Sequence, residues 1–252
     1  MGIAGIPDRA ERPELWVCQL GVVPYREALA LQEEVRAARQ ADAIPDVLLV
    51  LEHPPVYTLG RRASMADLGR GERWYRDQGI EIERIDRGGH VTYHAPGQLV
   101  AYPIVRTDSA REHVATMERA IVAALADEGV ETYTRDDEGV QYLGVWAGDG
   151  KIASVGVRVQ RGVTTHGLAI NVTNDVAPFA WVVACGLPDV RMVSVATVTG
   201  RADDPMRCLR KRVAHRYALA AGRRQRLVSE ARLRTALGRA AAAGADAAPV
   251  LA

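Results

Sequence analysis

The chain has 252 residues, of which 48% are hydrophobic and 25% are charged, and its formal net charge is +1. This composition is typical of a globular protein with a sizeable core, and it excludes the highly charged, weakly hydrophobic class of disordered chains. The balanced charge argues against a general binder of nucleic acids or membrane surfaces, and neither a membrane span of roughly 20 apolar residues nor a secretory signal is predicted.

The first half of the chain is predicted to alternate strands with a helix. That helix runs from Pro24 to Gln40, because proline suits the first helical position and apolar residues recur after it at helical spacing. Strands are predicted at residues 16–22, 46–52, 56–59, 82–85 and 99–105.

The second half combines one clear helix with strands joined by short turns. The helix is predicted for residues 109–127, with Ser109 as its cap and Glu112 three residues later. Four strands at residues 130–134, 140–146, 152–159 and 163–172 precede a last helix at 205–221. Because the links between these strands are of hairpin length, the pattern favours an α+β fold over a doubly wound parallel sheet.

From about Gly222 the composition changes to arginine and alanine with little apolar periodicity. We therefore predict one domain over residues 14–222, followed by an Arg/Ala-rich C-terminal tail at 223–252. Within that tail, residues 240–252 are expected to be disordered.

The most informative stretch is residues 87–98, called the glycine segment below. It holds three glycines, a proline and two histidines between predicted strands. Gly88 and Gly89 let another backbone or a ligand approach closely, and the Pro96-Gly97 pair favours a turn. A segment of this kind indicates a ligand-contacting loop, although a hairpin with a bulge is the simpler alternative.

Lysine is rare in this chain, since Lys151 and Lys211 are the only two among 32 basic residues. Lys211 lies in a basic helical run and is expected to be solvated. Lys151 follows a tight Gly-Asp-Gly turn and opens an apolar strand. An amine can lose its proton where a guanidinium cannot, so Lys151 is a candidate for a chemical role.

The three cysteines, Cys18, Cys185 and Cys208, are far apart and show no Cys-x-x-Cys spacing. Reduced thiols in a cytoplasmic compartment are therefore expected. Cys185 follows an apolar run and precedes Gly-Leu-Pro. It is either a buried inert thiol or a nucleophile whose thiolate is stabilised by a nearby ammonium, for which Lys151 is the candidate.

Two histidines of the glycine segment, His90 and His94, are four residues apart and could share one face of a strand. No further ligand stands at a recognisable zinc spacing, so no metal is predicted. The remaining histidines are His53 and His166, which stay open between structural and functional roles, and His113 and His215, which are expected on exposed helical faces.

Five segments in order resemble the octanoyltransferases of lipoate biosynthesis, a group within the biotin/lipoate-ligase superfamily. They are residues 52–61, 87–98, 150–157, 166–172 and 179–186. One such segment would be a weak signal, but five in sequence are specific. The resemblance implies an acyltransferase with a biotin/lipoate-ligase-like fold, whose mixed, largely antiparallel sheet is flanked by helices, and with no cofactor.

In that family a cysteine takes the acyl group as a thioester and a lysine tunes it, so the resemblance assigns these roles to Cys185 and Lys151. The implied donor is octanoyl-acyl carrier protein, and the implied acceptors are lipoyl domains of 2-oxoacid dehydrogenases and the glycine cleavage H protein, with no nucleic acid or membrane partner. The implied acyl pocket comprises Arg87, Gly88, Gly89, His90, Val91, Thr92, Tyr93, His94, Ser154, Val155, Gly156, Gly167, Leu168 and Ala169.

Two alternatives stay open. An ATP-dependent lipoate or biotin ligase on the same fold would use Lys151 to steady an acyl-adenylate and would not need Cys185. A non-catalytic acyl or nucleic-acid binder would use the arginine-rich residues 207–226, although no aromatic platform accompanies those charges.

Overall fold

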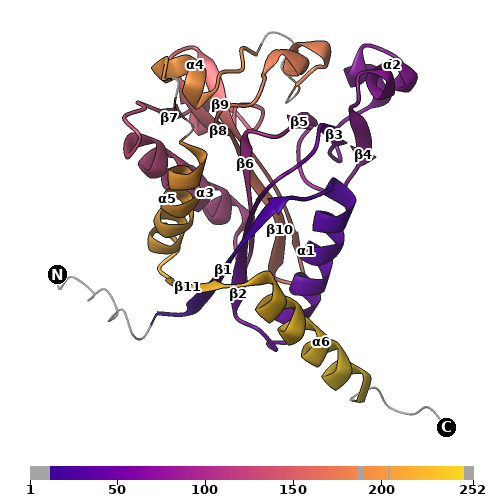
Figure 1. Ribbon diagram of the computed structural model, residues 1–252, viewed down its shortest axis with the longest axis vertical. Helices are drawn as coiled ribbons and strands as arrows, with labels where there is room; N and C mark the ends of the chain where they lie inside the picture. Colours follow the sequence, from indigo (N-terminus) through magenta and orange to yellow (C-terminus); the bar gives the residue numbers. More distant parts are fainter. Residues whose placement is uncertain (1–11, 185, 187–189, 202, 204, 247–252) are drawn as a thin grey trace.

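The computed structural model describes residues 12–184, 186, 190–201, 203 and 205–246. Eight strands form one sheet in the order β11-β1-β2-β6-β10-β9-β8-β7 (Figure 1). They are β1 (Glu14–Val22), β2 (Asp46–Glu52), β6 (Gln98–Ile104), β7 (Tyr133–Thr134), β8 (Gly144–Ala147), β9 (Gly150–Gln160), β10 (Val163–Asn171) and β11 (Arg224–Val228). The pairings of β1 with β11 and β2 are parallel and the others antiparallel, so the sheet is mixed and largely antiparallel, as predicted.

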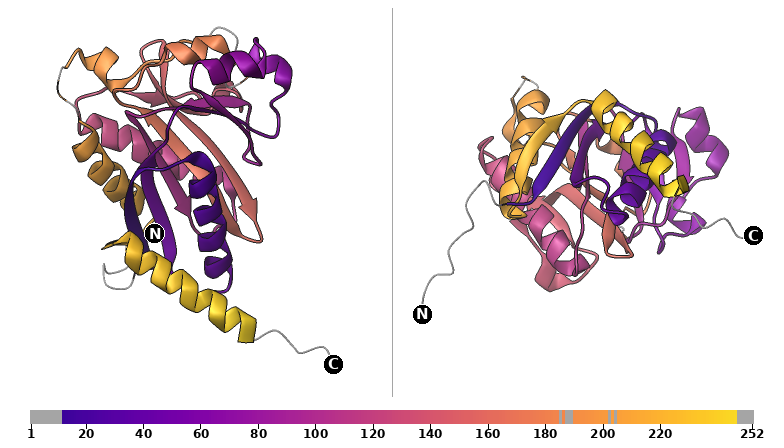
Figure 2. Two further views of the ribbon diagram at one scale, coloured as in Figure 1. Left: turned by 45° about the vertical axis from the view of Figure 1, so that its right-hand side comes forward. Right: turned by 90° about the horizontal axis from the view of Figure 1, so that it is seen from below.

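Long helices cover both faces of this sheet, as Figures 1 and 2 show. They are α1 (Tyr25–Gln40), α3 (Ala110–Ala126), α5 (Met206–Ala220) and α6 (Glu230–Asp246). Side chains alternate along β1, so Leu15 and Val17 pack with α3 and α5, whereas Trp16 and Cys18 pack with α1 and α6. Over the described residues, every helix is too short or too polar to traverse a lipid bilayer.

A second, three-stranded sheet stands beside the large one. It has the order β4-β3-β5, with β3 (Val56–Leu59) parallel to β4 (Glu81–Arg84) and antiparallel to β5 (Val91–His94). A hairpin between residues 82–85 and 99–105 is therefore wrong, because β5 pairs with β3 and leaves β4 and β6 in different sheets. The short helices are η1 (Met65–Leu68), α2 (Glu72–Asp77), η2 (Asp136–Glu138), η3 (Ala177–Trp181) and α4 (Val195–Thr199).

Local signals predicted most helix boundaries. The Ser109 side chain accepts a hydrogen bond from the Glu112 backbone N–H at 3.2 Å, which confirms the predicted cap of α3. The predicted helices at 24–40 and 205–221 correspond to α1 and α5 within one residue at each end.

The C-terminal residues differ from the predicted tail. Residues 224–228 form β11 at the edge of the large sheet, and α6 continues through residues 240–246, which were expected to be disordered. Alanine is the strongest helix former, and Leu233 and Leu237, four residues apart, pack into the core shared with α1. Residues 247–252 lie outside the described part of the chain, and the domain boundary at 222 stays a prediction.

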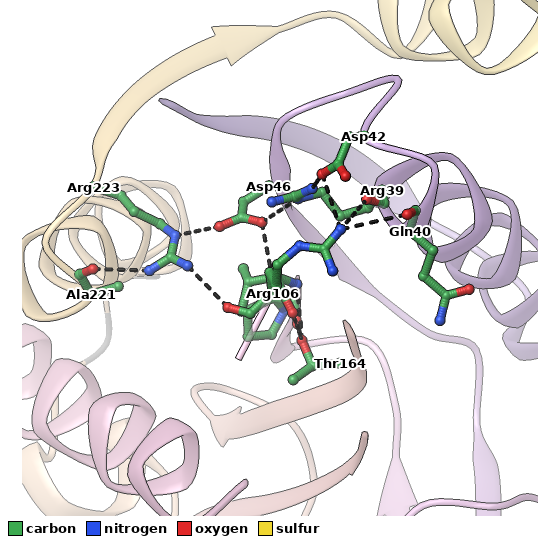
Figure 3. Close-up of polar contacts among 10 residues, drawn as sticks. Arg39, Gln40, Asp42, Asp46, Arg106, Thr164, Ala221 and Arg223 are labelled. Carbon is green, nitrogen blue, oxygen red and sulfur yellow. Dashed lines mark hydrogen bonds and ion pairs between the residues drawn. The ribbon is translucent and has the colours of Figure 1, made fainter. Parts of the chain in front are cut away.

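A buried carboxylate ties β11 to the rest of the sheet (Figure 3). Asp46, at the start of β2, accepts hydrogen bonds from Arg223 Nε at 2.5 Å, Arg39 Nε at 2.7 Å and the Arg106 backbone N–H at 3.0 Å. Removing one partner of a buried ion pair typically costs about 3–5 kcal/mol. The Asp46 cluster therefore holds the C-terminal strand in place.

Candidate active site

A cavity of about 510 Å³ lies between the glycine segment and strands β9 and β10. The structure brings most of the sequence-predicted pocket together here: residues 87–92 and 94, 154–156 and 167–169 all line the cavity, and so does Lys151. The volume falls in the range of small-molecule sites, which span roughly 300–1,000 Å³.

Two glycines allow the walls of the cavity to approach each other, because glycine has no side chain. Gly156 and Gly167 are direct partners across β9 and β10. A Cβ on Gly156 would lie 3.2 Å from Arg87 Cδ, and one on Gly167 would lie 2.3 Å from the Ala101 carbonyl oxygen. Any larger residue would push the glycine segment or β6 away, so both glycines are needed to shape the cavity.

Tyr93 is the described residue of the predicted pocket that does not line the cavity. Side chains alternate along β5, so Thr92 and His94 face the cavity and Tyr93 points away. Its ring packs 5.2 Å from that of Tyr57 and 5.6 Å from that of Phe179, measured between centroids. Assigning the run 87–94 as a whole ignored this alternation, and Tyr93 supports the wall from behind.

Four buried side chains close one end of the cavity, called the deep end below: Tyr25, His94, Tyr102 and His166. Tyr25 stacks on His94 at a ring distance of 6.0 Å, and its hydroxyl lies 3.4 Å from His166 Nδ1. His166 Nε2 lies 2.8 Å from a carboxylate oxygen of Asp86. A carboxylate oxygen accepts, so Nε2 carries the proton and Nδ1 accepts from Tyr25.

His53 supports the deep end from behind. Its Nδ1 lies 2.7 Å from the Val23 carbonyl oxygen, which can only accept, so Nδ1 donates and Nε2 accepts from the Tyr102 hydroxyl, also at 2.7 Å. Burial lowers the pKa of His53 to about 4 and that of His166 to about 3, and it also lowers the pKa of His94. The deep end is therefore neutral near pH 7.

His166 is also strained, which sequence did not predict. Its φ of +60° places a side-chain-bearing residue in the left-handed region in the middle of β10. The Gln32 side chain accepts its backbone N–H at 2.7 Å and helps to hold this conformation. Strain of this kind concentrates at functional sites, so it separates His166 from an ordinary core histidine.

Lys151 lies on the same cavity and is only 1% exposed. Its Nζ stands 5.6 Å from the centroid of the Trp146 ring, a favourable distance for a cation over an aromatic face. A Cβ on Gly144 would lie 2.8 Å from Lys151 Cε, so that glycine leaves room for the lysine stem.

Glu118 is a candidate functional residue that the sequence prediction missed. It is a buried carboxylate on α3 and accepts the Gly144 N–H at 2.7 Å. Burial raises its pKa, while that hydrogen bond and the charge of Lys151 oppose the rise. The sequence held one signal that could have identified Glu118, namely a charged residue within the apolar stripe between Val114 and Ile121.

Cys185, the predicted nucleophile, lies outside the described residues, but the chain on both sides of it contacts the cavity wall. Ala184 pairs with Val91 and Met192 pairs with Lys151, each in an isolated parallel bridge. The Lys151 N–H donates to the Arg191 carbonyl at 2.8 Å.

Gly186 lies on the other side of Cys185 and faces the glycine segment. It has φ +73°, and a Cβ there would come within 2.9 Å of the His90 ring. Ala184, Gly186 and Met192 therefore each lie against a residue that lines the cavity, namely Val91, His90 and Lys151 respectively.

The exposed part of the cavity, called the rim below, carries two cations. Arg61 and Arg62 line the cavity there and are exposed, as is Val140, at 58%. The sequence prediction did not assign these residues, although the basic Gly-Arg-Arg run was visible. Other cavity residues absent from the prediction are Tyr25, Tyr102, Val114, Gln141, Leu143, Val157 and His166.

Several histidines and cysteines outside the cavity can be compared with the exposure predicted for them. His113 is buried against Tyr217 rather than exposed, because it faces α5, and burial lowers its pKa to about 4. His215 is exposed, as predicted. Burial raises the pKa of Cys18 to about 11, which leaves that thiol inert. Within the described residues, no group of three or more His, Cys, Asp and Glu side chains is placed to hold a metal ion.

The chain is similar to known proteins over most of its length. Residues 24–216 match the family model of the lipoyl protein ligase A/B catalytic domain. An octanoyltransferase of Syntrophotalea carbinolica is 43% identical over 186 residues, which cover 72% of this chain and 83% of that protein. An octanoyltransferase of Acidothermus cellulolyticus is 45% identical over 185 residues, which cover 72% and 80%.

A solved structure shows the same fold. Lipoate-protein ligase A bound with ATP has a TM-score of 0.74 at 19% identity, covering 90% of this chain and 93% of that one. This similarity confirms the predicted biotin/lipoate-ligase-like fold class. At 19% identity, the structural similarity is evidence for the fold and not for the activity.

Proposed function

The chain belongs to the lipoyl protein ligase A/B catalytic-domain family and is an acyltransferase, and we propose that it moves an octanoyl group from octanoyl-acyl carrier protein to lipoyl domains. The group passes through a thioester on Cys185 to a lysine amine of the acceptor, a lipoyl domain of a 2-oxoacid dehydrogenase or the glycine cleavage H protein. The observation that supports this proposal is one cavity lined by Lys151, Val91 and His90, because Val91 pairs with Ala184 and His90 lies against Gly186, the residues on either side of Cys185.

The cavity suits a medium-length acyl chain. The apolar residues Val155, Val157 and Leu168 line it, and its deep end is formed by buried, neutral side chains. An octanoyl tail carries seven carbons beyond its carbonyl, and burying them at about 0.8 kcal/mol each gives roughly 5–6 kcal/mol of binding free energy.

Lys151 is proposed to move the protons that the two transfers require. In the first, the Cys185 thiolate attacks the donor thioester, the carrier thiolate leaves, and the Lys151 ammonium gives it a proton. In the second, the acceptor amine attacks the Cys185 thioester, its proton passes to the Lys151 amine, and the Cys185 thiolate is restored. Atoms and charge balance over the cycle, and amide formation drives it without ATP.

Intact-mass measurement after mixing the protein with octanoyl-acyl carrier protein, without ATP, tests this function. We expect the gain of one octanoyl group, its absence in Cys185→Ser and its retention in Cys208→Ser, which removes an exposed thiol. Octanoyl transfer that needs ATP and survives in Cys185→Ser would replace the proposal with the ligase mechanism.

A further inference from the structure

The rim of the cavity presents two arginine side chains toward solvent. Arg61 and Arg62 line the cavity and are exposed, and neither forms an ion pair with any residue of the described chain. The third arginine of the cavity, Arg87, is buried and donates to the Thr58 carbonyl and hydroxyl oxygens at 2.7 and 2.9 Å. Arg87 therefore stabilises the cavity wall, whereas Arg61 and Arg62, called the rim pair below, are exposed to solvent.

The backbone of the rim pair is fixed to the glycine segment. The Arg61 N–H donates to the Arg87 carbonyl at 3.0 Å, and the Arg62 N–H donates to the Gly89 carbonyl at 3.1 Å. A Cβ on Gly60 would lie 2.5 Å from the Gly89 carbonyl oxygen, so the loop can approach this closely only with glycine at that position. The backbone positions of Arg61 and Arg62 are consequently fixed relative to the glycine segment, which forms part of the cavity wall.

We propose that Arg61 and Arg62 bind the phosphodiester of the carrier arm that delivers the acyl group. This inference rests on the proposed function, in which the donor thioester ends a phosphopantetheine arm. That arm must cross the rim for its thioester to reach Lys151, and its phosphodiester is its anionic group. Guanidinium groups match phosphate oxygens with paired, charge-assisted hydrogen bonds.

Two apolar residues of the cavity suit the rest of the arm. Val140 and Leu143 also line the cavity, and Val140 is largely exposed. An arm of short alkyl and amide units can lie along these apolar residues while its phosphodiester reaches the arginines. The rim thus offers both an apolar and a cationic surface to a ligand that has both parts.

Acyl-enzyme formation by three donors tests the proposal. Octanoyl-acyl carrier protein carries the phosphodiester and the protein, octanoyl-coenzyme A carries phosphates without the protein, and octanoyl-pantetheine carries neither. The initial rate with each is measured by quenched intact mass for the wild type and for Arg61→Ala/Arg62→Ala. The control is Arg111→Ala/Arg239→Ala, which removes the same charge from exposed positions outside the cavity.

We expect the rim variant to lose about 10- to 100-fold in rate with both phosphate-bearing donors and less than about threefold with octanoyl-pantetheine. The control variant should match the wild type with all three donors. A loss confined to the carrier-protein donor would assign the arginines to acidic side chains of the carrier and overturn the phosphodiester site.

Two further outcomes would also overturn it. Equal losses with all three donors would show that the variant damages the cavity and not a phosphate contact. Unchanged acylation combined with slower transfer to a lipoyl domain would assign the arginines to the acceptor. Failure of every donor to acylate the wild type would instead remove the proposed function itself.

Discussion

The two ends of the cavity are built on different physical principles. At the deep end, Tyr25, His94 and His166 are buried, neutral and held by packing and hydrogen bonds. At the rim, Arg61 and Arg62 are charged and exposed. Packing discriminates by shape and is insensitive to salt, whereas exposed charges act over a distance and are screened. Under the proposed function, recognition of the acyl chain and of its carrier can therefore vary independently.

The largest expected effect concerns Lys151, the proposed proton carrier, because replacing this lysine should leave both ends of the cavity intact. Lys151→Met and Lys151→Arg should each lower the single-turnover rate by about 10²- to 10⁴-fold, the usual contribution of a positioned acid or base. Lys211→Arg, which changes the other lysine of the chain, is the matched control. Full activity in Lys151→Arg would mean that no titratable amine is needed.

The next effect concerns acid stability, which should be a property of the deep end and not of the rim. The folded pKa values of His53 and His166, about 4 and about 3, lie below the value near 6.5 expected in the unfolded chain. As pH falls below that value the unfolded chain takes up protons first, so stability present above pH 6.5 is lost toward the folded pKa values. Between pH 7 and pH 5, each such histidine should lower the free energy of unfolding by about 2 kcal/mol.

Urea titrations at both pH values measure this loss. His53→Gln should reduce the loss of unfolding free energy between pH 7 and pH 5 by the contribution of one histidine, about 2 kcal/mol. His215→Gln, at an exposed position, should leave the loss unchanged. An identical loss in both variants would mean that His53 is not held neutral in the folded state.

A smaller effect concerns acyl length. Tyr25→Ala should lengthen the deep end and raise the preference for decanoyl over octanoyl donors by about 10-fold, since two more buried carbons add roughly 1.6 kcal/mol. Ratios of kcat/KM for the two donors provide the measurement, and Tyr25→Phe, which keeps the ring, is the control. An unaltered ratio in Tyr25→Ala would place the length limit elsewhere in the cavity.

The smallest expected effect is the response of activity to ionic strength, which distinguishes the rim from the deep end without a mutation. Raising the ionic strength from about 0.05 to 0.5 M shortens the screening length severalfold and should reduce kcat/KM for octanoyl-acyl carrier protein by about threefold to tenfold. The ratio of decanoyl to octanoyl activity should stay constant over the same range. A salt-dependent ratio would contradict the independence of the two ends.

Sequence predicted the parts of the fold that local signals determine. The apolar runs of β2 and β3 and the capped helix α3 match their predicted positions closely. β11 was missed because four of its five residues are exposed, so no period-2 pattern marks it as a strand. Its partner β1 lies about 210 positions away, a pairing that only the folded chain reveals.

The candidate site was predictable where its residues come in short motifs. The glycine segment and the facing stretches of β9 and β10 were found in this way, and they meet on one cavity. Tyr25 and Tyr102 were missed because the first belongs to the apolar stripe of α1 and the second to the buried strand β6, so each looks like an ordinary core residue. Only the approach of α1 and β6 to the same deep end distinguishes them.

The pairing of the last strand with the first sets the order in which the sheet can be completed. During synthesis β1 emerges early and finds β2 soon afterwards, but its other edge has no partner until Val228 has left the ribosome. A polypeptide stopped before that point exposes a row of unpaired backbone groups, which is a template for intermolecular association. Premature termination near the 3′ end of the message should therefore yield aggregates more readily than a shortened but active enzyme.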